Sequence, residues 1–320
     1  MRYALHRVLH SVLLLAALSV ASFLFADLAP GDYFSALQLD PRVTPETLAA
    51  LRAERGLDRP LPNRYVAWLV SAARGEFGYS LAYHTAAGPL IRERISGTLL
   101  LTGTATALAW LLAIPLGVFH ALRRGRWTDH VLKIAVAILL ATPELLLAIL
   151  LLVLAVRTGW LPPGGMHSPG WESLGAMGRF RDILRHMVIP VTVLVLSMLP
   201  ALHRHVRAAV AETLDAPFAL AARAHGIPRA RLLFRHILPA ALNPLISLFG
   251  FSLGALLSAS LLVEVLVGWP GLGPLFLDAI FARDFAIVLG VVMVSAATLI
   301  AGNLAADLLL YHADPRIRAR

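Results

Sequence analysis

Residues Ala221 to Pro239 read AARAHGIPRARLLFRHILP, a basic segment between two hydrophobic stretches of the chain. A connection between membrane helices needs only a few polar residues, whereas ordered loops often carry binding surfaces. The pattern predicts a short helix that begins at Ala216-Pro217 and ends at Gly226. A second helix would begin at Pro228 and run through Arg235, with Pro239 at the exit of the loop.

Arginines make this predicted helix pair basic. Arg229 and Arg231 lie on the second helix, where they could pair with acidic groups at the rim of a groove on a soluble partner. The alternative is a positively charged loop that lies on anionic lipid. The bounding prolines and the defined bend favour docking, because lipid attraction requires neither.

The composition outside this segment is that of a membrane protein. Hydrophobic residues make up 58% of the chain and charged residues 15%, whereas soluble domains are about a quarter charged. The net charge of +9 does not indicate nucleic acid, because arginines in short loops set membrane orientation. With no cysteine, the chain has no disulfide and no thiolate metal ligand.

The chain carries no phosphate-binding loop. Lys133, its only lysine, lies between Leu132 and Ile134, so a Gly-Lys-Ser/Thr sequence cannot occur. We therefore expect no nucleotide site or other cofactor in this chain, and any ATP hydrolysis would take place in another one.

Hydrophobic stretches predict an all-α membrane protein with about six transmembrane helices, each long enough for the roughly 20 residues that a crossing needs. The predicted spans are 8–28, 98–122, 131–157, 183–203, 241–267 and 285–310. We interpret the first span as an uncleaved anchor. A signal peptide cleaved near Ala26-Asp27-Leu28-Ala29 is the alternative.

Short loops predict the orientation. Arginines gather at 123–126, 204–235 and 316–320, which all fall on the side of Arg2 and Arg7 if there are six crossings. That side is therefore predicted to be cytoplasmic, with both termini there, in the plasma (inner) membrane. The segment 29–95 is longer and mixes acids with its arginines, so we expect it outside.

The outer segment is predicted to be helical. Thr44-Pro45-Glu46 is a good helix start, and Asn63 to Arg74 places Tyr65 and Trp68 on one face. These helices would cap the outer mouth; alternatively they lie at the membrane interface. We divide the chain into an N-terminal transmembrane anchor (1–28), an extracytoplasmic helical segment (29–95), a transmembrane core (96–310) with a cytoplasmic loop at about 206–240, and a cytoplasmic tail (311–320).

Small residues recur at helical spacing in two spans. The second span carries Thr98, Thr102, Ala105, Ala109, Ala113 and Gly117, and the fifth carries Ser247, Gly250, Gly254 and Ser258. Such stripes let helix backbones approach closely. The alternative is a narrow polar pathway, for which Ser247 and Ser258 are candidate lining residues.

An acidic residue lies near the middle of the third span. Glu144 follows Pro143, and an ionisable group inside a membrane span is costly enough to suggest a substrate or ion contact. A hydrogen bond between subunits is the alternative. No metal constellation is found, because His203 and His205 are two residues apart and cannot share a helix face. No nucleophile and base arrangement supports catalysis, so we expect no enzyme.

The basic loop resembles the EAA motif of permease subunits in binding-protein-dependent ABC importers. That motif is EAA, three residues, glycine, nine residues and I-x-L-P; Ala221-Ala222, Gly226 and Leu238-Pro239 match its spacing. Leu220 stands where the glutamate would be and His236 where the isoleucine would be. The departure at Leu220 puts in doubt whether the first contact with an ATPase is polar.

Further motifs resemble the dipeptide, oligopeptide and nickel branch of this family and extend over nearly the whole chain. They are APGD at 29–32, GLDRPL at 56–61, GEFGYS at 75–80, GWLPPG at 159–164, VE at 263–264, GWPGLG at 268–273, RD at 283–284 and DPRIR at 314–318. Several matches in order make the resemblance specific.

The resemblance implies the type I ABC importer permease fold, a second permease subunit that is often a sister chain, and two cytoplasmic ATPases that use ATP and magnesium. It also implies an extracytoplasmic solute-binding protein docked over segment 29–95. Ala221, Ala222, Gly226 and Pro239 would then belong to the loop that seats in the ATPase cleft.

The expected function is ATP-driven import, with di- or oligopeptides as cargo and nickel or another small solute as the alternative. A different class of function is an ion-coupled carrier or channel that works without an ATPase, using Glu144, Glu264 and Asp307. A membrane scaffold without a pathway is a third possibility, which the ordered stripes of small residues disfavour.

Overall fold

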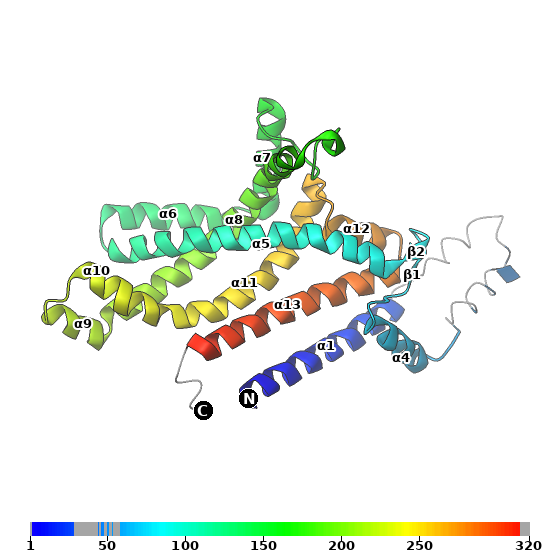
Figure 1. Ribbon diagram of the computed structural model, residues 1–320, viewed down its shortest axis with the longest axis horizontal. Coiled ribbons are helices and arrows are strands. Elements are labelled where there is room, and N and C mark those ends of the chain that lie inside the picture. Colours follow the sequence, from blue (N-terminus) through cyan, green and yellow to red (C-terminus); the bar gives the residue numbers. More distant parts are fainter. Residues whose placement is uncertain are drawn as a thin grey trace. The chain divides into compact units, whose positions relative to one another are not determined.

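The computed structural model describes residues 2–28, 44, 46–47, 50, 53 and 58–313 (Figure 1). Within them, five long helices are apolar enough to cross a membrane: α1 (Arg2–Leu28), α5 (Ala87–Leu122), α8 (Ala176–Asp215), α11 (Leu238–Val267) and α13 (Phe285–Ala313). A sixth crossing is formed if α6 (Trp127–Ala141) and α7 (Glu144–Thr158) are one broken span. The all-α class and the order of about six predicted spans are confirmed.

The third predicted span is not continuous. α6 and α7 meet at an angle of 93° rather than forming one helix over 131–157. Thr142 is extended, with φ −84° and ψ 118°, because the residue before a proline avoids the helical region. Pro143 then precedes the first turn of α7, where its missing N–H is not needed.

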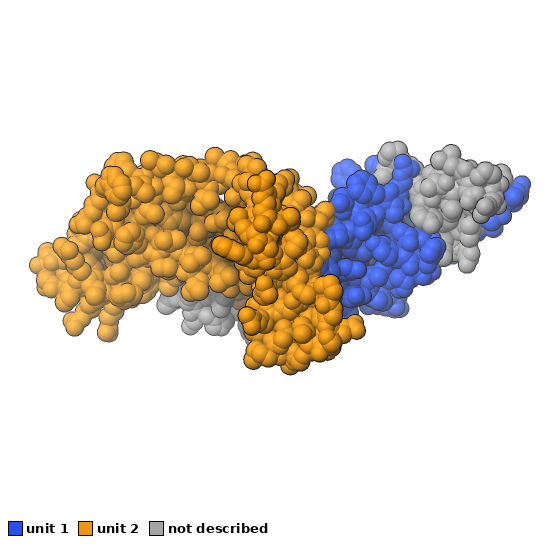
Figure 2. Space-filling view, turned by 90° about the horizontal axis from the view of Figure 1, so that it is seen from above, with its two compact units in different colours: residues 1–98, 270–298 blue, residues 99–269, 299–320 orange. Residues whose placement is uncertain are grey.

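The chain folds into two compact units, which Figure 2 distinguishes by colour. The first comprises Met1–Thr98 and Pro270–Thr298, and the second comprises Leu99–Trp269 and Leu299–Arg320. Each unit therefore combines segments that are far apart in the sequence.

In the first unit, α4 (Leu61–Ala72) packs against α1 through aromatic rings. Tyr65 donates or accepts a 2.8 Å hydrogen bond with Ser19, and its ring meets that of Phe23 edge-on at 5.5 Å. The predicted helix at Asn63 to Arg74 is thus confirmed, two residues earlier, since Pro62 fits its first turn. The helix predicted from Thr44 lies mostly outside the described residues, although the Thr47 amide donates to the Thr44 hydroxyl at 3.2 Å.

The first unit also contains a small hairpin and a short helix. β1 (Tyr79–Ser80) pairs antiparallel with β2 (Thr85–Ala86). Tyr79 lies opposite Ala86, and Ser80 lies opposite Thr85. α12 (Leu272–Phe281) begins where the amide of Leu272 donates to the Thr98 hydroxyl at 2.8 Å. These contacts join the beginning of α5 to a segment more than 170 residues later in the chain.

In the second unit, α6, α7 and α11 pack against α8. The stripe of small residues on α5 is buried along its length, and a Cβ added to Gly117 would lie 2.6 Å from Val206 of α8. On α11, a Cβ on Gly250 would lie 2.5 Å from the Ala306 methyl of α13, and one on Gly254 would overlap Leu299. Both glycines therefore serve close helix packing.

Candidate functional site

The loop between α8 and α11 begins with α9 (Pro217–Ala224), which ends as predicted at Gly226. Gly226 has φ 75°, the left-handed conformation that glycine adopts without steric cost. Its amide donates to Arg223 O at 3.0 Å, and the amide of Ile227 donates to Ala222 O at 3.1 Å. These two bonds form a Schellman motif, which closes the end of the helix and turns the chain.

The second half of the loop differs from the prediction. α10 (Arg229–Leu232) continues through a π-helical turn at Leu233–Ile237 directly into α11, so no separate helix ends at Arg235. Pro239 lies in the first turn of α11 rather than at an exit from the loop. A proline has no N–H to give to the preceding turn and its ring crowds that turn, which accounts for the wider π turn just before it.

One side of the loop packs into the hydrophobic core of the second unit, of which the loop is part. Ala219, Leu232 and Ile237 are buried in its hydrophobic core, and Ala222 and Ile227 pack at the edge of that core. The Arg223 guanidinium donates to the carbonyl of Leu214 at 3.2 Å, which ties α9 to the end of α8. The loop is therefore a folded part of the unit.

The other side of the loop is exposed. Ala221 lies about 200° around α9 from the buried Ala219, so it faces outward. It is flanked by Phe218 and Leu220, whose exposed fractions are 47% and 53%. The exposed side of α9 is therefore a flat alanine face between two large apolar side chains, and Leu220 occupies the position of the glutamate in the EAA motif.

The neighbouring helix α10 carries exposed arginines. Arg229 and Arg231 on α10 are exposed, as is Pro239, and α9 and α10 project together at the left of Figure 1. The loop thus contains two adjoining helices, with exposed apolar side chains on α9 and exposed arginines on α10.

The pathway candidates lie on α7 and α11. Glu144 is half-buried at the first turn of α7, and its Oε1 has no hydrogen-bond partner among the described residues. Ser258 is exposed on α11, and its hydroxyl donates to Gly254 O at 3.4 Å. Ser247 also belongs to α11, but its side chain lies outside the described part of the structure. Their role in a pathway remains a prediction.

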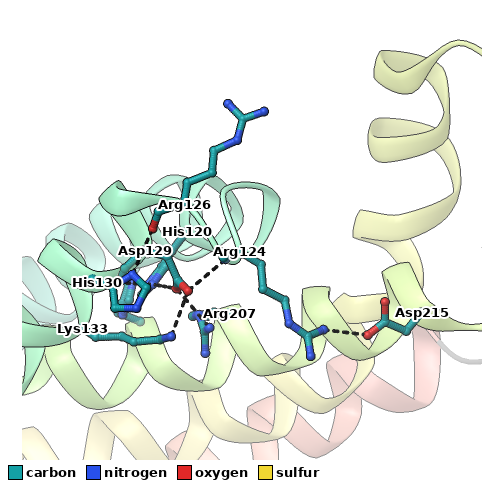
Figure 3. A network of polar contacts seen from close by, with 10 residues as sticks. His120, Arg124, Arg126, Asp129, His130, Lys133, Arg207 and Asp215 are labelled. Atoms are coloured by element: carbon teal, nitrogen blue, oxygen red, sulfur yellow. Dashed lines mark hydrogen bonds and ion pairs between the residues drawn. The ribbon is translucent and has the colours of Figure 1, made fainter.

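Close to the loop lies a buried polar network that the sequence did not predict (Figure 3). Asp129, in the first turn of α6, is only 1% exposed. Its Oδ1 accepts from His120 Nε2 at 2.6 Å and from Arg207 Nη2 at 3.2 Å. Its Oδ2 accepts from Lys133 Nζ at 2.8 Å and from the amide of Gly125 at 3.1 Å.

The network continues through a pair of histidines. His120 Nδ1 and His203 Nε2 are 3.1 Å apart, and their rings are stacked with centroids 4.9 Å apart. A neutral His120 that donates from Nε2 to Asp129 accepts at Nδ1 from His203. His203 thus pairs across helices with His120, not with its neighbour His205. The burial of His120 could have been predicted from the sequence, because His120 continues the buried stripe of α5 three residues after Gly117.

In the first unit, the structure joins two motifs that are far apart in the sequence. Ser80 of the GEFGYS segment donates its hydroxyl hydrogen to Asp284 Oδ2 at 2.6 Å. The amide of Ala82 donates to the same oxygen at 3.1 Å, and the amide of Tyr83 donates to the Ser80 hydroxyl at 3.0 Å. Asp284 therefore holds the hairpin in place.

Comparison with known proteins assigns both parts of the chain. Residues 113–319 match the family described as binding-protein-dependent transport system inner membrane component, and residues 1–101 match the family described as the N-terminal part of the membrane component of such systems. A putative peptide permease protein of Brucella ovis is 34% identical over 322 residues, which cover 99% of each chain. The oligopeptide transport system permease protein AppB of Bacillus subtilis is 34% identical over 317 residues, which cover 98% of each chain.

Among solved structures, an inward-facing conformation of the MetNI methionine ABC transporter has a similar chain. The TM-score is 0.53 at 19% identity, and the match covers 70% of this chain and 96% of the other. At that identity the likeness bears on the fold alone.

Proposed function

This chain belongs to the family of binding-protein-dependent transport system inner membrane components, and on that premise we propose that it forms a peptide pathway driven by a separate ATPase that docks on α9 and α10. Members of this family are permease subunits of ABC importers, so the chain is a transport component of the inner membrane and not an enzyme. The ion-coupled carrier without an ATPase finds no support in this membership.

The observation that carries the proposal is the exposed side of α9. A helix with small side chains on its outward face can enter a groove deeply, because its backbone comes close to the walls. Phe218 and Leu220 would fill apolar pockets on either side, and Arg229 and Arg231 would meet acidic groups at the rim. A cleft on the ATPase with apolar pockets and an acidic rim would hold the loop. When ATP binding closes the ATPase, the cleft would move the loop with it.

The arrangement of arginines supports a cytoplasmic location for this loop and for both chain ends. We infer an assembly of this chain with a second permease subunit, two ATPases that use ATP and magnesium, and a solute-binding protein outside. Segment 29–95 would face that binding protein. The tail from residue 314 lies outside the described residues.

Peptide cargo is supported by the relatives. Proteins named as permeases for peptides, oligopeptides and D,D-dipeptides match nearly the full length of this chain. A pathway for peptides must accept varied side chains, so the external binding protein would select the cargo. Uptake of labelled di- and tripeptides by cells that express the full set of subunits, against cells that lack this permease, would test the cargo.

The docking proposal is tested at Gly226. A Cβ at this position meets nothing within 4 Å, so a substitution there strains only the backbone. We expect Gly226→Val to cost about 1–2 kcal/mol in the native loop geometry, which would weaken binding about ten-fold. Gly226→Asn should retain binding, because asparagine tolerates the left-handed conformation.

The readout is the amount of ATPase that co-purifies with the permease, followed by ATP-dependent peptide uptake in proteoliposomes. Gly159→Val is a matched control, because Gly159 has φ 66° and equally open surroundings but caps α7. Gly159→Val should suffer the same backbone strain, but the amount of co-purified ATPase should stay at the wild-type level. Unchanged association and uptake in Gly226→Val would overturn the docking proposal.

A further inference from the structure

Asp129 is the point at which four segments of the second unit converge. Its carboxylate accepts hydrogen bonds from α5, from the α5–α6 turn, from α6 and from α8, as described above. Three of the four donors belong to side chains that carry or can carry positive charge. Because Asp129 and His120 are both buried, loss of the carboxylate would leave the buried His120 donor unpaired, and such donors are costly.

The network ends close to the docking loop. Arg207 belongs to the same helix as Asp215, and α8 rises about 1.5 Å per residue between them. Asp215 is the last residue of α8, directly before α9, and its carboxylate accepts from Arg124 at 2.8 Å. The Arg124 side chain of the α5–α6 turn therefore reaches the end of α8, next to the start of the loop (Figure 3).

The two contacts between this turn and α8 differ in strength. The side chains of Arg124 and Asp215 are 64% and 67% exposed, and ion pairs of this kind are screened by water and salt. Asp129 and its histidine partner are shielded from solvent, and side chains there are held in one geometry by several bonds. Of the two contacts, the one at Asp129 is therefore the better placed to hold the turn and α8 together.

We propose that Asp129 is a positioning residue for energy coupling: it fixes the cytoplasmic part of α8 to the α5–α6 turn, so that a displacement of α9 is passed to α5 and α6. Without this link, α8 could slide against its neighbours and absorb the movement of the loop. The inference rests on the proposed function, because it concerns how force from a docked ATPase reaches the membrane helices.

The test is the number of solute molecules moved per ATP hydrolysed, measured in proteoliposomes that contain the complete transporter. Asp129→Asn keeps the size of the side chain but removes its charge. It should lower this ratio by about five-fold or more while the amount of co-purified ATPase stays the same. Asp215→Asn is the matched control, since it makes the same chemical change in the exposed pair, and its ratio should remain near that of the wild type.

A wild-type ratio in Asp129→Asn would overturn the inference. If Asp129→Asn fails to assemble, Arg207→Gln decides, because Asp129 then keeps its bonds to His120, Lys133 and Gly125. A reduced ratio with normal assembly supports the inference, and a wild-type ratio rejects it. If the wild-type complex itself moves no solute with ATP, the proposed function fails instead, which the wild-type measurement shows separately.

Discussion

Tyr83 illustrates how a single side chain joins the hairpin of the first unit to α12. Its hydroxyl donates to Asp278 Oδ2 at 3.3 Å, while its amide donates to the Ser80 hydroxyl. Burial and then the negative charge of Asp278 raise the pKa of Tyr83 above its ordinary value. The folded protein therefore favours the neutral, protonated phenol.

The sign of the pH dependence follows from that direction. The stabilisation by Tyr83 is fully present below the pKa of an unfolded tyrosine, about 10, and is lost as pH rises through the higher folded pKa. Subtracting the tyrosinate absorbance of Tyr83→Phe from that of the wild type isolates the signal of Tyr83. We expect this difference to rise at a higher pH than the absorbance of a free tyrosine. Titration of this difference at or below the ordinary pKa would contradict the assignment, and Tyr79→Phe in the same hairpin serves as the control.

At this scale the buried polar residues could be predicted only in part. The burial of His120 follows from the stripe on α5, whose spacing it continues. The identity of its partner does not, because His203 lies 83 residues later and nothing in the local pattern links the two helices. Asp129 likewise looks like an ordinary first-turn acid, and only packing reveals that it is buried.

At the scale of helices, the same residue type has different consequences in different places. α6 and α7, which lie on either side of Pro143, meet at an angle of 93°. Pro190 and Pro200, in contrast, lie inside a continuous α8. Inside membrane proteins, neighbouring helices and small adjustments can satisfy the backbone groups that proline frees. The bend at Pro143 and the π turn before Pro239 therefore depend on what packs around each site, which a single sequence does not display.

The glycines of α11 provide a prediction at this scale. A Cβ on Gly250 would meet the Ala306 methyl and the backbone of Asn303 at 3.2 Å, neither of which can move aside by a rotamer change. We expect Gly250→Ala to destabilise the protein by about 1–3 kcal/mol through overpacking. Thermal unfolding in detergent would measure this cost.

The control for Gly250 is Gly103, an exposed glycine of α5 with no atom within 4 Å of an added Cβ. Gly103→Ala should be neutral or stabilise by up to about 1 kcal/mol, because alanine favours the helix. Equal unfolding temperatures for the two variants would show that α11 and α13 do not pack closely at Gly250.

At the scale of the whole molecule, the order of the spans predicts the sidedness of the loops. With six crossings, the α8–α11 loop is cytoplasmic and the α7–α8 connection is outside. Because the chain has no cysteine, single cysteines can report accessibility without background labelling from this chain. Met177, 78% exposed near the start of α8, and Arg231 on α10 are suitable positions.

We expect a membrane-impermeant thiol reagent to label Met177→Cys in intact cells from which any outer membrane has been removed. Arg231→Cys should react only after the inner membrane is permeabilised. The reverse pattern would place the docking loop outside the cell and would exclude contact with a cytoplasmic ATPase.

One amino-acid sequence was enough to predict the membrane class, the order of the spans, the position of the glycine bend and the lack of a phosphate-binding loop. These properties depend on composition, local spacing and backbone preferences, which are visible in one chain. The folded chain was needed to find that the third span is bent, that α10 continues into α11, and that Asp129, His120 and His203 share one network. Those features depend on contacts between distant segments, and their energies exceed the local preferences that a sequence pattern expresses.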